Sequence, residues 1–314
     1  MSEPLIVSLC LLALTVGFVL VNRFTQIGTV ARGTFREAIR QPVFLFMIGV
    51  AIALFVLYLY LPFFTLGNDT QVYIDSCLAT VLVSSLLLAI WTASQSVAEE
   101  REGKTIMTLL SKPITRAQFV LGKFLGILEA VLLQIFLLAL VLLPATYEKF
   151  GLDAKESGAG RVARFERTDF DGRLSNEITF LEPQRTATAV SVIPPLGLVF
   201  LQVAVMTSIA VAISTRLPAL VGIILCLAIF ILGNLAPTLI AAAPDADNLV
   251  FLKFVAQLFA TLFPGLWMFD TFTAIATNNA IPEIHLGTIA VYSICYMAAM
   301  MLVAFLLFED EDLA

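Results

Sequence analysis

Long apolar runs without charge alternate along the chain with short stretches that carry most of the charged residues. A helix needs about 20 apolar residues to cross roughly 30 Å of hydrocarbon. The predicted membrane spans are Pro4–Asn22, Val43–Leu66, Ser76–Ala98, Glu129–Tyr147, Thr186–Thr215, Leu217–Pro244 and Leu286–Phe308. A further apolar run, Phe254–Phe269, is short and is interrupted by Pro264-Gly265. We therefore expect a re-entrant helix over 249–269, before the last span.

Composition turns this pattern into a class of protein. Of the 314 residues, 60% are hydrophobic and 13% charged, whereas a soluble domain is about 45–50% apolar and about 25% charged. So little charge cannot cover a soluble surface, and a net charge of −6 argues against a nucleic-acid partner. The sequence predicts an all-α polytopic membrane protein.

Catalytic and metal-binding chemistry is poorly supported by the residue types available. The four cysteines lie in apolar runs without a CxxC pair, so we expect buried free thiols, and with a single histidine we expect no metal site. Stretches between spans are no longer than about 40 residues, which is short for a soluble domain. The chain is therefore not expected to be an enzyme, and energy for transport must come from another chain or from an ion gradient.

The positions of Lys and Arg predict the orientation in a plasma (inner) membrane. Residues 22–42, 99–123 and 214–217 are rich in basic side chains and are expected to be cytoplasmic, together with the C-terminus. The first run lacks a basic n-region and is followed by Arg23, which favours an uncleaved anchor with its N-terminus outside. The segment 146–192 is then an outer loop, with a candidate hairpin turn at Asp171-Gly172.

The segment 27–41 has the pattern of a basic amphipathic helix. Arg32, Arg36 and Arg40 share one arc, and apolar residues including Ala31 and Ala38 share the opposite arc. Such a helix is expected to lie at the inner membrane interface, or simply to anchor the topology.

The segment 98–118 holds the densest charge cluster. Its acidic start, its glycine and its Pro-Ile-Thr-Arg sequence predict a short helix, a break and re-entry into the membrane. Gly103-Lys104-Thr105 is similar to the end of a phosphate-binding loop, but the position of the first glycine is Ala98 and a membrane span precedes it. This context excludes nucleotide binding by the motif.

These two segments carry a resemblance to a known family. The matching residues are Glu99-Glu100-Arg101-Glu102-Gly103-Lys104-Thr105, Leu109-Leu110-Ser111, Pro113-Ile114, Arg116 and Gly122-Lys123. This pattern resembles the signature of type-2 ATP-binding-cassette (ABC) transporter permeases, with Lys104 inserted. Residues 31–40 are similar to the family's N-terminal elbow helix. The overall likeness is greatest to the subgroup named for multicopper-enzyme maturation and nitrous-oxide-reductase accessory permeases.

The resemblance implies a division into an extra N-terminal transmembrane helix, 1–26, and a six-helix permease domain, 27–314. It implies an exporter built from two identical or different permease chains, with ATP and Mg bound by separate ATPase subunits and no cofactor in this chain. The ATPase-coupling residues would be Glu99, Glu100, Glu102, Gly103, Lys104, Pro113 and Arg116, with Arg216 as a smaller contact. An ion-driven secondary transporter and a membrane assembly scaffold remain alternatives, the former requiring paired ionisable groups and an inverted repeat.

One helix face inside the membrane also draws attention. Gly122, Gly126 and Glu129 lie within one arc of a helix, and small residues at this spacing allow close helix approach. Glu129 should then point into the bundle, where Gln202 and Asn234 are candidate polar neighbours together with Gln134. The face serves either helix packing or the translocation path.

Overall fold

The computed structural model describes residues 2–60, 69–102, 115–156, 184–242, 264–271 and 282–309. Within these ranges the regular elements are helical, and the all-α prediction is confirmed. The elements are α1 (Ser2–Phe24), α2 (Gln26–Arg40), α3 (Pro42–Tyr60), α4 (Asp69–Glu102), α6 (Arg116–Glu156), α9 (Ile193–Ser214), α10 (Ala219–Ala242), the 3-10 helix η3 (Leu266–Phe269) and α13 (Glu283–Glu309). Residues 184–190, before α9, are also helical.

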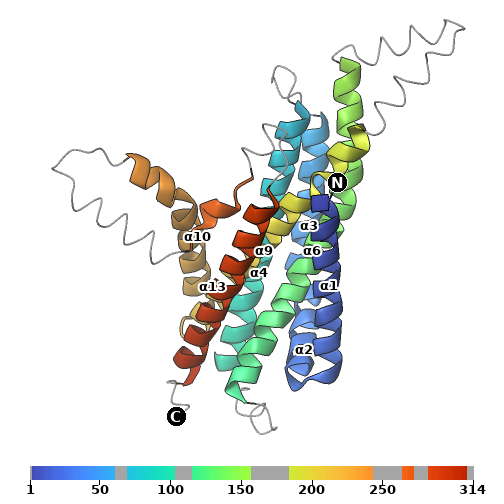
Figure 1. The fold of residues 1–314 in the computed structure, drawn as a ribbon. Coiled ribbons are helices and arrows are strands. Elements are labelled where there is room, and N and C mark those ends of the chain that lie inside the picture. Colours follow the sequence, from blue (N-terminus) through green and yellow to red (C-terminus); the bar gives the residue numbers. More distant parts are fainter. Residues whose placement is uncertain are drawn as a thin grey trace, which may run out of the picture.

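The helices form one elongated bundle, in which α4 and α6 extend beyond the start of α1 (Figure 1). Among the described residues, five helical stretches are long and apolar enough to cross a membrane: Pro42–Tyr60, Asp69–Ser96, Ala117–Asp153, Gln184–Ser214 and Ile284–Leu307. Pro4–Phe18 and Ala219–Leu235 are shorter apolar stretches, within α1 and α10. The chain is therefore a multi-pass membrane protein, as predicted.

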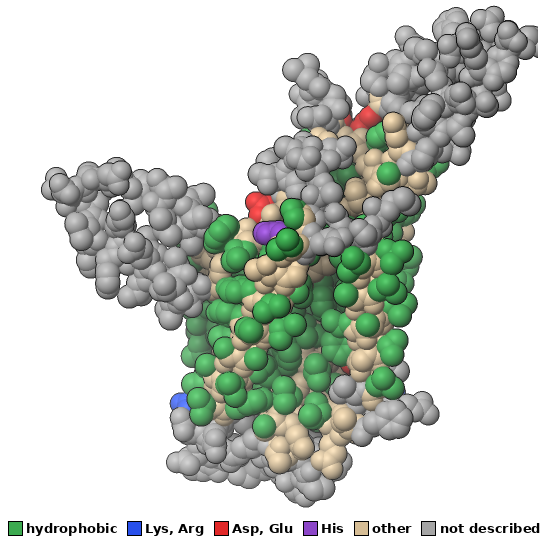
Figure 2. All heavy atoms as spheres, viewed as in Figure 1, with side chains coloured by type: hydrophobic (Ala, Val, Ile, Leu, Met, Phe, Trp, Pro, Cys, Tyr) green, Lys and Arg blue, Asp and Glu red, His purple; other side chains and the backbone are tan. Residues whose placement is uncertain are grey.

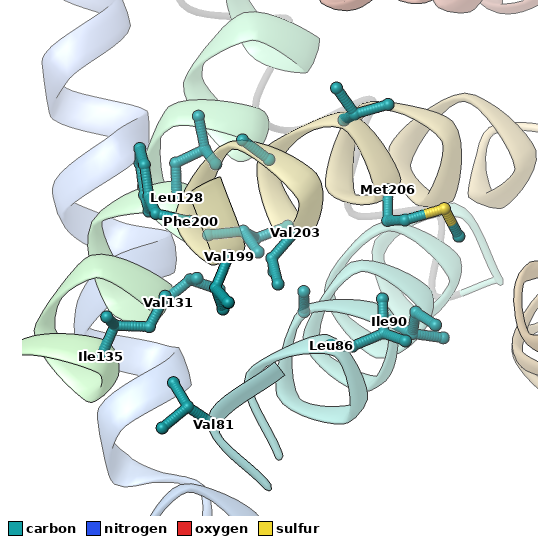
Figure 3. Close-up of a cluster of buried hydrophobic side chains, with 14 of the residues drawn as sticks. Val81, Leu86, Ile90, Leu128, Val131, Ile135, Val199, Phe200, Val203 and Met206 are labelled. Carbon is teal, nitrogen blue, oxygen red and sulfur yellow. The ribbon is translucent and has the colours of Figure 1, made fainter. Parts of the chain in front are cut away.

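Helix α9 lies at the centre of the bundle. Of its membrane window, 83% is buried, compared with 17% for α3 and 22% for α13. It packs against α4, α6, α10 and α13, and Figure 3 shows part of this core, in which Val199, Phe200 and Val203 of α9 lie beside Leu128 and Val131 of α6. Lipid is as apolar as leucine, so these helices associate through close van der Waals packing rather than through removal of apolar surface from water.

The outer surface of the bundle is apolar, as a bilayer requires. Figure 2 shows hydrophobic side chains across the middle of one face, with charged side chains near its two ends. The expectation of buried cysteines is wrong for two of the four: Cys77 and Cys226 are buried, but Cys10 and Cys295 are exposed on α1 and α13. Lipid accommodates an exposed thiol, so an apolar run does not imply burial.

Part of the predicted re-entrant segment can be located. Residues 264–271 contain η3, whose Leu266 is fully buried, and the backbone N–H of Gly265 donates to the hydroxyl of Tyr292 on α13 at 3.0 Å. A Cβ added at Gly233 of α10 would lie 3.0 Å from Leu266 Cδ1. η3 is therefore seated between α10 and α13. The remainder of 249–269 and the candidate hairpin at Asp171-Gly172 lie outside the described residues.

Candidate functional site

The end of the bundle at which α4 ends and α6 begins, here called the inner end, gathers the residues singled out by the sequence. Helix α6 starts with a reciprocal cap: the N–H of Thr115 donates to Gln118 Oε1 at 3.0 Å, and the N–H of Gln118 donates to Thr115 Oγ1 at 3.3 Å. A cap of this kind satisfies two backbone donors that would otherwise lack partners. It fixes where the helix begins, immediately after the segment 103–114.

A buried lysine joins three helices at this end. Lys123 of α6 has only 4% of its side chain exposed, and its Nζ donates to Ser96 Oγ of α4 at 2.6 Å. The same Nζ lies 3.7 Å from Oε2 of Glu37 on α2, and Ser96 Oγ donates to that oxygen at 3.3 Å. The Phe119 ring centroid lies 5.7 Å from the ammonium. We call Glu37, Ser96 and Lys123 the inner network.

The electrostatics of the inner network are asymmetric. Glu37 keeps 39% of its side chain exposed, whereas Lys123 is almost completely enclosed. Burying a charge is costly unless a counter-charge and hydrogen bonds compensate for lost water. The lysine therefore depends on α2 and α4 remaining in place, and displacement of either helix changes the free energy of its charged form.

Two glycines hold α2 close to α6 beside this network. A Cβ added at Gly122 would lie 2.6 Å from Val30 Cβ, and one added at Gly126 would lie 2.5 Å from the carbonyl oxygen of Ala31. Real Cβ atoms do not come so close, so the helix crossing requires glycine at both positions. The small residues predicted to permit close approach thus contact the elbow helix.

Helix α2 has the predicted distribution of side chains. Ala31, Thr34 and Ala38 are buried, while Arg32, Arg36 and Arg40 are exposed. Thr25 caps its start by accepting from the N–H of Gly28 at 3.1 Å. The apolar arc therefore faces the bundle, and the three arginines are free to face headgroups or a partner.

The structure positions the residues predicted to couple to an ATPase only in part. Glu99, Glu100 and Glu102 occupy the last turns of α4, and Arg116 is the first residue of α6. Gly103, Lys104 and Pro113 lie outside the described residues.

The short turn between α9 and α10 is tied to the C-terminal helix. Arg216 is exposed, and its Nε donates to the carbonyl of Leu307 in α13 at 2.9 Å. Nearby, a Cβ at Gly222 of α10 would lie 3.4 Å from Ser94 Oγ of α4. The inner end of α4 is thus flanked by α6 on one side and by α10 on another.

The candidate polar residues in the membrane lie on three different helices. Glu129 is half-buried on α6, Gln202 is buried on α9, and Asn234 is half-buried on α10. The Asn234 Nδ2 donates to the carbonyl of Phe230 within its own helix at 2.9 Å. Asn234 therefore already has a local partner for its amide.

A second polar cluster occupies the opposite, outer end of the bundle. The Lys149 Nζ lies 3.2 Å from Asp153 Oδ1, one turn along α6, with 6% of the lysine side chain exposed. Thr70 of α4 donates to the other carboxylate oxygen of Asp153. The Arg185 guanidinium lies 5.4 Å from the ring centroid of Tyr147. These contacts hold the extension of α6 beyond Tyr147 against α4 and residues 184–190.

Sequence reasoning did not single out Glu37 or Ser96. One signal was available: Glu37 is the acidic residue within the basic segment 27–41, and Lys123 follows the apolar start of a membrane helix. An acidic residue in a basic segment and a lysine in an apolar helix each predict an ion pair, although neither position identifies the partner.

Comparison with known protein families gives a match over most of the chain. A family model described as ABC-2 family transporter protein matches residues 28–313. A search of curated proteins finds no match. The matched region begins within α2 and leaves out α1.

Proposed function

Because the chain belongs to the ABC-2 family of transporter proteins, and is thus a transmembrane subunit of an ABC transporter, we propose that its inner network couples ATP hydrolysis on separate ATPase subunits to movement of the bundle. In this proposal the chain is an exporter permease in a plasma (inner) membrane. It pairs with a second permease chain, identical or different, and its inner end faces the cytoplasm. Its N-terminus then lies outside.

The observation that carries the proposal is the contact of Lys123 with α4 and α2. The end of α4 and the start of α6 belong to segment 98–118, which the family resemblance predicts to dock on the ATPase. A displacement there reaches Ser96 and Lys123 within two or three turns of helix, by 1.5 Å rise per residue. The network then passes the displacement to Glu37 and the elbow helix, so three helices move together.

Neighbouring features support the same use of this end. The glycine crossing keeps α2 in contact with α6, and the cap at Thr115 makes α6 rigid from its first residue. Arg216 offers a second surface on the turn between α9 and α10. Gly122 and Lys123, which belong to the family pattern, are therefore joined to the core by packed and hydrogen-bonded contacts.

The likeness to the multicopper-enzyme maturation and nitrous-oxide-reductase accessory subgroup stays a prediction and does not identify the cargo. ATP and Mg are expected on the partner ATPase, with this chain supplying the path and the coupling contacts. The other predicted alternative, an ion-driven transporter, is an outcome that the following experiment distinguishes.

The test is the ATPase activity of the complex captured with the tagged chain from gently solubilised membranes and reconstituted in liposomes. We expect Lys123→Met to leave the ATPase subunits bound while reducing vanadate-sensitive hydrolysis by roughly tenfold or more, the factor for about 1.4 kcal/mol of lost coupling. Lys123→Arg should restore part of it, because a cation is retained.

The matched control is Lys149→Met, which removes an equally buried lysine from the same helix at the other end. It should leave the rate of hydrolysis within about twofold of the unsubstituted complex, which corresponds to a change of about 0.4 kcal/mol in activation free energy. The proposal is wrong if the chain repeatedly purifies without an ATPase, as an ion-driven transporter would, or if both lysine variants have the same effect.

A further inference from the structure

Unsatisfied polar side chains occur on both α4 and α6, further along each helix from the inner end than the inner network. Ser85 and Thr92 of α4 and Gln134 of α6 are all fully buried. Among the described residues, the hydroxyl oxygens of Ser85 and Thr92 and both amide atoms of Gln134 have no hydrogen-bond partner. An unpaired polar group is costly in protein surrounded by hydrocarbon, because water cannot reach it.

Other buried or partly buried hydroxyls on α4 avoid the free-energy cost of an unpaired polar group by bonding to backbone carbonyls. Ser84, next to Ser85, donates its Oγ to the carbonyl of Val81 at 3.2 Å, and Thr80 donates to the carbonyl of Ser76 at 2.9 Å. Helical serine and threonine commonly satisfy themselves in this way. Ser85 and Thr92 have the same option but do not use it in this arrangement of the helices.

The helix register places these groups opposite one another. Lys123 and Ser96 are in contact across the α4–α6 interface. Ser85 lies eleven residues before Ser96 and Gln134 lies eleven residues after Lys123, which is about three turns in each helix. Because α4 and α6 run in opposite directions, Ser85 and Gln134 both lie on the same side of the Lys123–Ser96 contact along the bundle axis. Eleven residues are close to a whole number of turns, so each residue lies on the helix face that makes this contact and at a similar depth. Thr92 lies one turn from Ser96 along this seam.

We propose that Gln134 and Ser85 hydrogen-bond to each other in a second arrangement of α4 against α6, which the transport cycle visits. Gln134 is then a positioning residue: its amide donates to or accepts from the serine hydroxyl when α4 pivots at the Lys123–Ser96 contact and closes on α6. Thr92 lies between the contact and this pair and gains a partner in the same movement.

This inference rests on the proposed coupling function, because the pivot is driven from segment 103–114. The physical basis is a difference in contacts between two states. A group that is unpaired in one arrangement and paired in the other shifts the equilibrium toward the second by the free energy of that pairing. Four unpaired atoms at one interface favour the second arrangement without making the present one unstable.

Substitution of Gln134 by Leu, which has a similar volume, separates this role from an ordinary structural one. We expect Gln134→Leu and Ser85→Ala each to raise the melting temperature of the purified chain by about 2–4 °C, because an unpaired buried group is removed. Vanadate-sensitive hydrolysis by the complex should fall by roughly three- to tenfold, because the second arrangement loses its hydrogen bond.

The control is Ser84→Ala, which removes a neighbouring buried hydroxyl that already has a partner. Its melting temperature should not rise, and its hydrolysis should match that of the unsubstituted complex. If Gln134→Leu instead lowers the melting temperature, the amide is a structural hydrogen-bonding group in the present arrangement and the proposal is overturned. This measurement needs no ATPase, so it stands apart from the coupling proposal.

A disulfide provides the second measurement. Ser85→Cys and Gln134→Cys are combined in a complex whose Cys10, Cys77, Cys226 and Cys295 have been replaced by alanine. We expect oxidative cross-linking to be stronger after trapping with ATP and vanadate than without nucleotide. Equal yields in both states, including no cross-link in either, overturn the second arrangement. Loss of coupling itself is detected separately by an unaltered rate of hydrolysis in Lys123→Met.

Discussion

The two ends of α6 each bury a lysine, and the difference between them lies in where its acidic partner comes from. At the inner end, the carboxylate that pairs with Lys123 comes from Glu37 on α2, and the Ser96 hydroxyl of α4 accepts a hydrogen bond from the same ammonium. At the outer end, the carboxylate that pairs with Lys149 comes from Asp153, one turn away on α6 itself. The inner cluster therefore depends on the positions of three helices, whereas both charges of the outer ion pair lie on α6 and α4 contributes only the Thr70 hydroxyl.

This difference indicates how a similar chemical group can serve two purposes. An ion pair within one helix stiffens it but reports nothing about neighbouring helices. An ion pair between helices changes in strength whenever they move apart, because the Coulomb energy and the desolvation of the buried charge both depend on separation. Variants at the two ends should therefore differ in what they disturb.

The largest effect is expected at the inner carboxylate. Glu37→Gln leaves the buried ammonium of Lys123 without that carboxylate, and we expect a loss of about 2–3 kcal/mol in stability, below the range for a fully buried ion pair because Glu37 is partly exposed. Thermal unfolding in detergent measures it. Lys123→Met in the same background should recover part of the loss, because it removes a buried charge that no longer has the Glu37 carboxylate beside it. A change below 0.5 kcal/mol or so, as for a surface pair, would show that the charge of Lys123 does not depend on Glu37.

The glycine crossing is the next most sensitive feature. Gly126→Val adds a Cβ where the Ala31 carbonyl lies 2.5 Å away, and overpacking of this kind costs about 1–3 kcal/mol. The displaced α2 should also weaken the Glu37–Lys123 contact. Gly33→Ala is the control, because its Cβ would meet nothing within 4 Å; it should stabilise the helix by up to about 1 kcal/mol. Equal destabilisation by both variants would contradict the close crossing.

A smaller effect is expected at the outer end. Asp153→Asn removes the partner of Lys149 but retains an acceptor for Thr70, so we expect a loss of about 1–2 kcal/mol. Vanadate-sensitive hydrolysis should be unchanged, in contrast to Glu37→Gln. Thermal unfolding and hydrolysis are measured on the same preparations of both variants. The proposed difference between the two ends of α6 is wrong if Asp153→Asn reduces hydrolysis as strongly as Glu37→Gln does.

The smallest effect is expected at the cap of α6. Thr115→Ala removes the side-chain acceptor for the N–H of Gln118, and caps of this type contribute about 1 kcal/mol. Fraying should be confined to the first turn, and hydrogen exchange of amides 116–119 measures it. Thr115→Ser retains the hydroxyl and should behave as the unsubstituted chain. Exchange that spreads to Lys123 would show that the inner network depends on the cap.

Much of the fold follows from the apolar pattern. Each predicted span is helical over most of its described residues, and Ala31 and Ala38 are buried opposite the exposed arginines, as the arc predicts. The length of α6 could not be predicted in the same way. Its charged residues beyond Tyr147 resemble a loop if a helix is required to be apolar, but a helix that projects from the bilayer has no such requirement.

Residue partners were harder to predict than elements. Spacing showed that Gly122 and Gly126 permit close approach, but a single helix does not show which neighbour approaches, and α2 was the partner. Likewise, Lys123 occurs in the family pattern while Ser96 and Glu37 come from elsewhere in the chain. Contacts between distant segments depend on helix order and crossing, which local periodicity does not contain.

The uninterrupted length of α6 has a mechanical consequence. At 1.5 Å per residue, Arg116 lies about 10 Å from Lys123 on one side, and Glu156 lies about 50 Å from it on the other. Treated as a rigid lever turning at Lys123, the helix would tilt by about 6° when its inner tip moves about 1 Å, and its far tip would sweep about 5 Å. Pro144 lies within the long arm, so bending of the helix at Pro144 would determine how much of this displacement reaches the far tip.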